Sequence, residues 1–268
     1  MEHLLSFLEN VLVVPILTAL GTFLFTVVRK RIIRARQRRV LRFTEKDDKS
    51  RKDVNCITAN TGQYDEGELV TLGYVFEYIA VGELRVAFKQ LFKHIDIGVK
   101  MSPVEYGDMH MSDLKSNMIL IGGPFHNCVS RELLFSGKFD FPFSFDDNAN
   151  LYHDNGDGTT DKFEPKQSDL NNKFYELDYA LIVNIKNPKM PSKRLIALIG
   201  CRSVGCYGAA YFLSHKLHKL KKIIKDDEYA VVVRCQCDEE DIINMPEFVK
   251  YYPLSSDKAS TAEKSQTL

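Results

Sequence analysis

The chain has 268 residues, of which 44% are hydrophobic and 27% charged, as in a globular protein with room for a sizeable core. Its formal net charge of zero argues against a nucleic-acid partner, although basic residues gather between Arg29 and Lys52. The six cysteines form no CxxC pair and are typical of reduced thiols in a cytoplasmic domain.

The first expected element is a membrane-spanning helix. Val11 to Val28 carry no charge over about 18 residues, close to the minimum that crosses a hydrocarbon core of about 30 Å. A cleaved signal peptide is disfavoured, because no basic residues precede the apolar run and no small-residue cleavage site ends it. The basic segment RKRIIRARQRRVLR follows directly, which places this flank in the cytoplasm and the N-terminus outside. We therefore expect residues 1–28 to be a single-pass anchor in the lipid bilayer.

Three further regions follow along the chain. Residues 29–55 are expected to be a basic juxtamembrane segment and linker, whose arginines recur with helical spacing. This segment could lie along the anionic inner leaflet, and nucleic-acid binding is the less favoured alternative. Residues 56–254 are expected to form a soluble α/β domain, and the polar residues 255–268 a disordered tail.

Within the soluble domain, helix-like and strand-like patterns alternate. Helices are expected at residues 66–94, 128–135 and 206–224. Strands are expected at residues 95–100, 117–123, 139–145, 150–153, 178–185, 194–200 and 229–236, with a turn at 154–158. The strand, glycine loop, helix and strand between residues 194 and 236 form a βαβ signature. The order predicts a Rossmann-like domain with a mostly parallel sheet and a β-hairpin insertion.

Two glycine-containing loops, residues 122–127 and 200–208, follow buried strands. In open α/β sheets, ligands bind beyond the carboxyl ends of the strands, where glycines allow close approach and helix N-termini present N–H groups to anions. Arg202 would add a cation, Ser203 a hydroxyl group, and Asn127 could recognise a base or ribose edge. The expected ligand-binding residues are Gly122, Gly123, Asn127, Gly200, Arg202, Ser203, Gly205 and Gly208. The alternative is that these glycines serve only turns and packing.

The second loop does not complete a phosphate-binding motif. Gly200 and Gly205 have the Walker separation, but Cys206 stands where the lysine should be, which argues against ATP hydrolysis. Cys128 and Cys206 each lie near an expected helix start, where a thiol pKa can fall.

No metal site and no cofactor are expected. Residues 153–161 resemble a calcium loop but lack its glutamate, so a hairpin turn is favoured. Cys235 and Cys237 alternate along a strand and face opposite sides of it. His215 and His218 lie one helical turn apart with no further ligand in view.

The segments ILIGGPFHN and LIGCRSVGCYGAA, behind an N-terminal membrane helix, resemble Rossmann-like nucleotide-sensing domains of prokaryotic signalling and antiphage systems. The domain order also resembles that of CRISPR-associated membrane effectors. The resemblance implies a membrane-anchored cytoplasmic sensor or effector that binds a nucleotide-like ligand and acts by changing homo-oligomerisation or membrane integrity. Two alternatives stay open: a membrane-tethered nucleotide or nucleoside hydrolase or transferase using Asp178, Glu132 or Cys206, and a scaffold with no small ligand.

Overall fold

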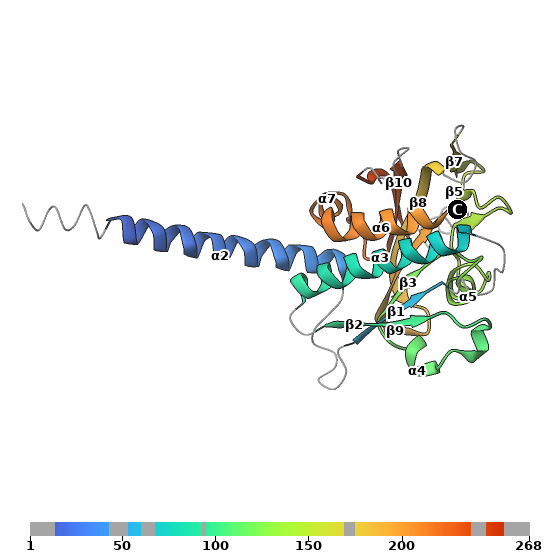
Figure 1. The fold of residues 1–268 in the computed structure, drawn as a ribbon, viewed down its shortest axis with the longest axis horizontal. Helices are drawn as coiled ribbons and strands as arrows, with labels where there is room; N and C mark the ends of the chain where they lie inside the picture. Colours follow the sequence, from blue (N-terminus) through green and yellow to red (C-terminus); the bar gives the residue numbers. More distant parts are fainter. Residues whose placement is uncertain are drawn as a thin grey trace, which may run out of the picture.

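The computed structural model describes residues 14–42, 53–59, 68–92, 95–168, 175–236 and 245–254. The expected disordered tail, most of the expected linker and the first residues of the expected membrane span lie outside these ranges. The described part is a mixed α/β domain from which one long helix extends (Figure 1). The expected α/β class is therefore confirmed.

The main sheet has eight strands, in the order β11-β10-β8-β9-β3-β1-β2, with β7 paired to β8. Their bounds are β1 Asp53–Thr58, β2 Asp96–Met101, β3 Met118–Ile121, β7 Lys166–Gln167, β8 Tyr175–Asn187, β9 Met190–Gly200, β10 Tyr229–Gln236 and β11 Glu247–Pro253. Strands β2, β1, β3 and β9 pair in parallel. Strand β8 is antiparallel to both β9 and β10, so β10 runs in the same direction as the parallel group. Most strands along the sheet thus share one direction, as the sequence predicted.

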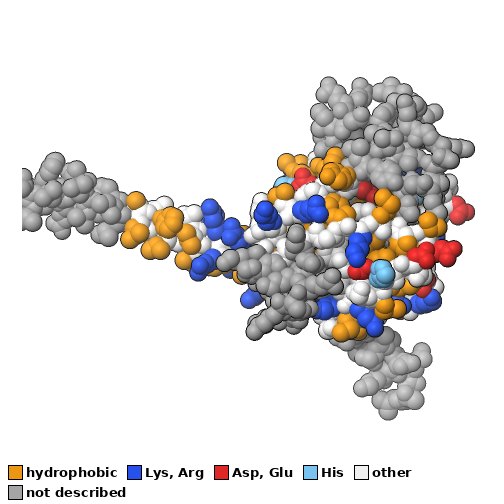
Figure 2. Space-filling model, turned by 60° about the horizontal axis from the view of Figure 1, so that its bottom comes forward, with side chains coloured by type: hydrophobic (Ala, Val, Ile, Leu, Met, Phe, Trp, Pro, Cys, Tyr) orange, Lys and Arg blue, Asp and Glu red, His pale blue; other side chains and the backbone are white. Residues whose placement is uncertain are grey.

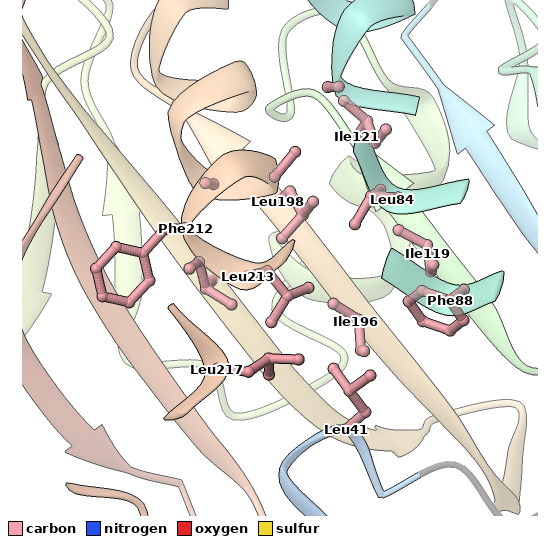
Figure 3. Close-up of a cluster of buried hydrophobic side chains, with 14 of the residues drawn as sticks. Leu41, Leu84, Phe88, Ile119, Ile121, Ile196, Leu198, Phe212, Leu213 and Leu217 are labelled. Atoms are coloured by element: carbon pink, nitrogen blue, oxygen red, sulfur yellow. The ribbon is translucent and has the colours of Figure 1, made fainter. Parts of the chain in front are cut away.

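Helices cover both faces of this sheet (Figure 1). One face packs against α3 (Glu68–Leu91), α6 (Ser203–His215), α7 (Leu217–Ile223) and the end of α2 (Val14–Leu41). Figure 3 shows this core, where Leu84 lies beside Ile119 and Leu198 of the strands. The other face packs against α4 (Met111–Leu114) and α5 (Cys128–Leu134), with the short helix η2 (Tyr106–Asp108) nearby.

The expected hairpin insertion is a small antiparallel sheet of β4 (Phe143–Phe145), β5 (Leu151–Asp154) and β6 (Thr160–Phe163). Strands β5 and β6 pair across the expected turn, where Gly156 and Gly158 have positive φ angles. Asp154 accepts a hydrogen bond from the Gly156 N–H at 2.8 Å, and Asp157 accepts one from Thr159. These carboxylates stabilise the turn itself, which agrees with a hairpin in place of a calcium loop.

Two boundaries differ from the sequence predictions. The segment beginning at Asp53 is strand β1 in the middle of the parallel sheet, although it was assigned to the linker. The single helix expected at 206–224 is two helices, α6 and α7, which are separated by Lys216. Helix α3 lies within the expected range 66–94 and runs unbroken past Gly82, where the apolar residues on both sides face the same buried layer.

Helix α2 is one continuous helix that contains the described part of the expected span and the basic segment. Among the described residues, no helix is long and apolar enough to cross a membrane, so the expected transmembrane helix is not supported. Within α2 the charged residues that begin at Arg29 limit the apolar stretch, and residues 11–13 lie outside the described part. Figure 2 shows hydrophobic side chains on the protruding part of α2 and Lys and Arg side chains between that part and the domain.

The basic segment is not simply a linker, because the last turn of α2 belongs to the core. Val40 and Leu41 are buried, and the Asn184 amide donates to their carbonyl oxygens at 3.2 and 3.1 Å. The Tyr229 hydroxyl also donates to the Val40 carbonyl, at 3.0 Å. The Arg194 guanidinium donates to Asn184 Oδ1 at 2.7 Å, which fixes the amide. The C-terminal carbonyls of α2, which an isolated helix leaves unpaired, are thus bonded inside the domain.

Candidate functional site

The structure brings the two glycine loops together at one edge of the sheet. They follow β3 and β9, which are parallel neighbours, so both loops leave the sheet at the carboxyl ends of the strands. The Gly122 N–H donates to the Leu198 carbonyl at 3.1 Å. A methyl group built on Gly123 would lie 3.5 Å from the Gly200 carbonyl oxygen, which is ordinary contact distance. This is the arrangement in which open α/β sheets bind ligands.

In the first loop, Gly122 has a φ of +104°, and a Cβ there would lie 2.8 Å from the Ala59 Cβ. Asn127 is fully buried and caps α5, accepting from the Val129 and Ser130 N–H groups at 3.1 Å. Its amide nitrogen donates to the carbonyls of Ile57 and Ile121, at 3.1 and 3.0 Å. An asparagine side chain offers two donated and about two accepted hydrogen bonds, so Asn127 has no capacity left for a ligand.

In the second loop, the N-terminus of α6 is capped by a carboxylate from a different strand. Asp178 of β8 is fully buried and accepts from the N–H groups of Gly205 at 2.6 Å, Tyr179 at 2.8 Å and Arg202 at 3.2 Å. Burial raises the pKa of Asp178 to about 7, and the N–H donors act in the opposite direction. The carboxyl group therefore occupies part of the anion-binding position that the sequence assigned to a ligand.

Three glycines of this loop are required by packing. A Cβ on Gly200 would lie 2.1 Å from the Arg202 carbonyl oxygen, and one on Gly205 would lie 2.6 Å from the Tyr179 carbonyl oxygen. A Cβ on Gly208 would lie 1.9 Å from the sulfur of Cys235. Each position admits only a hydrogen atom where other residues carry a side chain.

The outer rim of the two loops carries the groups that face solvent. Gly123, Arg202 and Ser203 are half-buried and His126 is exposed. Arg202 donates to the Asn148 carbonyl at 2.9 Å and lies over the Tyr175 ring at 4.8 Å, which holds the cation at this edge. Partial desolvation by neighbouring atoms, and then the positive charge of Arg202, lower the pKa of His126, which favours the neutral imidazole. The rim therefore offers one cation, one hydroxyl group and one neutral imidazole.

A buried acid that the sequence analysis missed lies beside the first loop. Glu77 of α3 is 7% exposed, and its Oε1 is 3.5 Å from where a Gly122 Cβ would be. Burial raises the pKa of Glu77 to about 7, opposed by a hydrogen bond from the Ala59 N–H. Helices α3 and α5 lie on opposite faces of the sheet, so Glu77 lies near a topological switch point between β1 and β3. A glutamate inside an otherwise apolar helical pattern is the signal that could have indicated it.

The three side chains considered for catalysis do not form one site. The Cys206 thiol is buried, accepts from the Gly200 N–H at 3.2 Å, and has a pKa raised by burial, so it is not an activated nucleophile. Asp178 is the cap of α6, and Glu132 forms an ion pair with Lys138 on the surface. Cys128 is buried with its sulfur 3.1 Å from the Pro103 carbonyl oxygen.

The described residues contain no group of three or more His, Cys, Asp or Glu side chains that could hold a metal ion. His215 pairs with Glu83 at 2.7 Å and stacks on Tyr211 at 4.3 Å, while His218 is exposed. Cys235 is buried, and Cys237 lies outside the described residues.

Comparisons of this chain with protein families, with curated proteins and with solved structures find no match, so the fold and the loop geometry are the basis for any functional assignment.

Proposed function

We propose that this protein is a membrane-associated sensor or effector that binds a nucleotide-like anion at the rim of the two glycine loops. The observation that carries the proposal is the meeting of these loops beyond the carboxyl ends of β3 and β9, with a fixed cation on their rim. The proposed ligand contacts are Gly123, Arg202 and Ser203, with His126 beside them. Gly122, Asn127, Gly200, Gly205 and Gly208 shape the loops.

The chemistry of the rim favours a phosphate-like group. A guanidinium group binds phosphate oxygens through two parallel N–H donors, and the Ser203 hydroxyl can donate a further hydrogen bond. A neutral imidazole can either donate or accept, so His126 suits a polar ring or sugar next to the anion. No buried, activated nucleophile accompanies these groups among the described residues, which favours binding over turnover.

We propose that α2 carries the membrane association. Its side chains at Leu20, Phe23, Leu24, Phe25 and Val28 are all more than half exposed, and arginines follow immediately. Apolar side chains on every side of a helix favour lipid over water, and adjacent arginines favour anionic headgroups. Under this proposal the ligand changes the association of copies of the chain at the bilayer.

Ligand binding is tested by thermal shift and product analysis on the full chain in lipid nanodiscs, with mono-, di- and cyclic nucleotides. A ligand at 100 times its dissociation constant stabilises the folded state by about 2.7 kcal/mol. We expect a shift without product, lost in Arg202→Ala and kept in Lys219→Ala, an exposed charge deletion on α7. No shift with any nucleotide would refute the ligand proposal, whereas product formation would assign an enzyme.

Membrane association is tested by flotation of the full chain with vesicles that contain anionic phospholipid. We expect the wild-type chain to float and the double variant Leu24→Glu with Phe25→Glu to remain at the bottom of the gradient. Equal flotation of both would exclude α2 as the lipid-binding element.

A further inference from the structure

A groove of about 620 Å³ lies beside the first glycine loop, and Pro124 and Phe125 of that loop form part of its wall. The remaining walls come from α5, from β4 and from the segment between them. Aromatic rings dominate the lining, which includes Phe125, Phe135, Phe139, Phe141, Phe143 and Phe145. A volume of this size is typical of a small-molecule site.

The pattern FDFPFSF explains how so many rings share one groove. Its four phenylalanines, Phe139, Phe141, Phe143 and Phe145, all line the groove, although only Phe143–Phe145 form a strand. The rings of Phe135 and Phe141 meet edge to face at 5.3 Å, and those of Phe135 and Phe145 at 5.6 Å. Edge-to-face packing leaves ring faces on which a further aromatic ring can stack. Phe125, which is 44% exposed, extends this surface toward the loop.

Arg131 is the charged residue in the groove wall. It is exposed, and within the described residues its guanidinium group has no hydrogen bond or ion pair. Of the acids close to it, Glu132 pairs with Lys138 and Asp146 accepts from Asn150 and Tyr152, whereas Asp140 and Asp147 do not line the groove. The faces of phenylalanine rings attract cations, but a fixed positive charge in the same groove opposes them. The charge of Arg131 is therefore complementary to an anion.

We propose that this groove binds a planar aromatic ring that carries an anionic group. The ring packs against the phenylalanines, with Phe141 in the middle of the FDFPFSF segment, and the anion pairs with Arg131. This inference goes beyond the proposed function, because it requires no ligand at the glycine loops. Through Pro124 and Phe125 the groove adjoins the first of those loops.

The test is isothermal titration calorimetry with the full chain in nanodiscs, with empty nanodiscs as the background. The probe is naphthalene-1-sulfonate, compared with neutral naphthalene-1-methanol and with octane-1-sulfonate, an aliphatic anion. We expect Arg131→Gln to weaken sulfonate binding at least about tenfold and to leave the neutral probe unchanged. Lys219→Gln, on the opposite face of the sheet from α5, is the matched charge control and should change neither.

The aromatic contribution is tested with Phe141→Leu and Phe139→Leu, which keep an apolar side chain but remove a ring. Both variants should weaken the two naphthalene probes several-fold and keep the wild-type melting temperature within a few degrees. Unchanged binding in Arg131→Gln, tighter binding of octane-1-sulfonate than of naphthalene-1-sulfonate, or no saturable binding would overturn the inference. Loss of nucleotide binding in Arg202→Ala but not in Arg131→Gln would leave the proposed function standing and place its ligand outside the groove. Groove binding of naphthalene-1-sulfonate without a thermal shift from any nucleotide would support the groove and refute the proposed function.

Discussion

The contact between Gly208 and Cys235 offers a direct test of whether the second glycine loop serves packing. The two residues lie on α6 and β10, and a Cβ on Gly208 would come within 1.9 Å of the Cys235 sulfur and 3.2 Å of its Cβ. Cys235 is 1% exposed, so its thiol has little space into which to move. The change Gly208→Ala should therefore overpack this part of the helix–sheet interface.

Two effects of known size oppose each other in this variant. Overpacking a core costs about 1–3 kcal/mol, whereas replacing glycine by alanine inside a helix gains about 1 kcal/mol. In the wild-type background, Gly208→Ala should thus lower the free energy of unfolding by up to about 2 kcal/mol. In a Cys235→Ala background the sulfur is gone, so the same change should be neutral or stabilising by up to about 1 kcal/mol. The expected coupling energy is about 1–3 kcal/mol.

The assay is urea denaturation of the four proteins of this double-mutant cycle, followed by circular dichroism, with equal denaturant slopes required for the comparison. Nucleotide binding is measured in parallel on the folded variants. Additive free-energy changes would refute the steric argument. Loss of ligand binding in Gly208→Ala without loss of stability would return Gly208 to the ligand-contact role that the sequence suggested.

Three further predictions concern buried polar groups. The pKa of Glu77 is raised from 4.5 to about 7, so between these pH values the folded state holds a proton that the unfolded state releases. The free energy of unfolding should therefore fall as the pH rises through this range. In urea titrations, Glu77→Gln should reduce this dependence of stability on pH. Asn184→Leu removes the donor to the last carbonyls of α2 and should increase the mobility of a spin label at position 34, whereas unchanged spectra would contradict the docking role. Asn127→Ala should cost about 1–3 kcal/mol through the lost α5 cap and unpaired carbonyls, with the ligand dissociation constant unchanged.

The sequence predicted the elements whose patterns are long or strongly apolar. The run of apolar residues before Gly122 and the one before Gly200 both read as buried strands, and both are central in the sheet. The βαβ unit from β9 through α6 to β10 is present, but β8 lies between its two strands. That insertion could not be predicted, because it depends on the pairing of β8 with both neighbours and not on any local pattern.

The sequence predicted the meeting of the two glycine loops better than it predicted the roles of their residues. The adjacency of the two loops follows from parallel strands, whose carboxyl ends meet at one edge. The full roles of Asn127 and Asp178 do not follow, since the Asn127 amide also donates to the remote Ile57 carbonyl, and Asp178 caps α6 from another strand. A glycine next to a helix start reads the same in sequence whether a ligand or a neighbouring side chain fills the space. Only the positions of Ala59, Tyr179 and Cys235 distinguish the two cases.

Strand β8 links the proposed ligand rim to helix α2. Asp178, near one end, holds the first turn of α6, and Asn184, further along, holds the last turn of α2. Six residues of a strand span about 20 Å, and both side chains are fully buried in the same rigid sheet. A flexible linker between the rim and α2 would not transmit a movement of the rim, but Asp178 and Asn184 belong to one continuous strand. Under the proposed function, ligand binding would therefore reorient α2 together with the domain, which places the response in the association of α2 helices and not in a local loop movement.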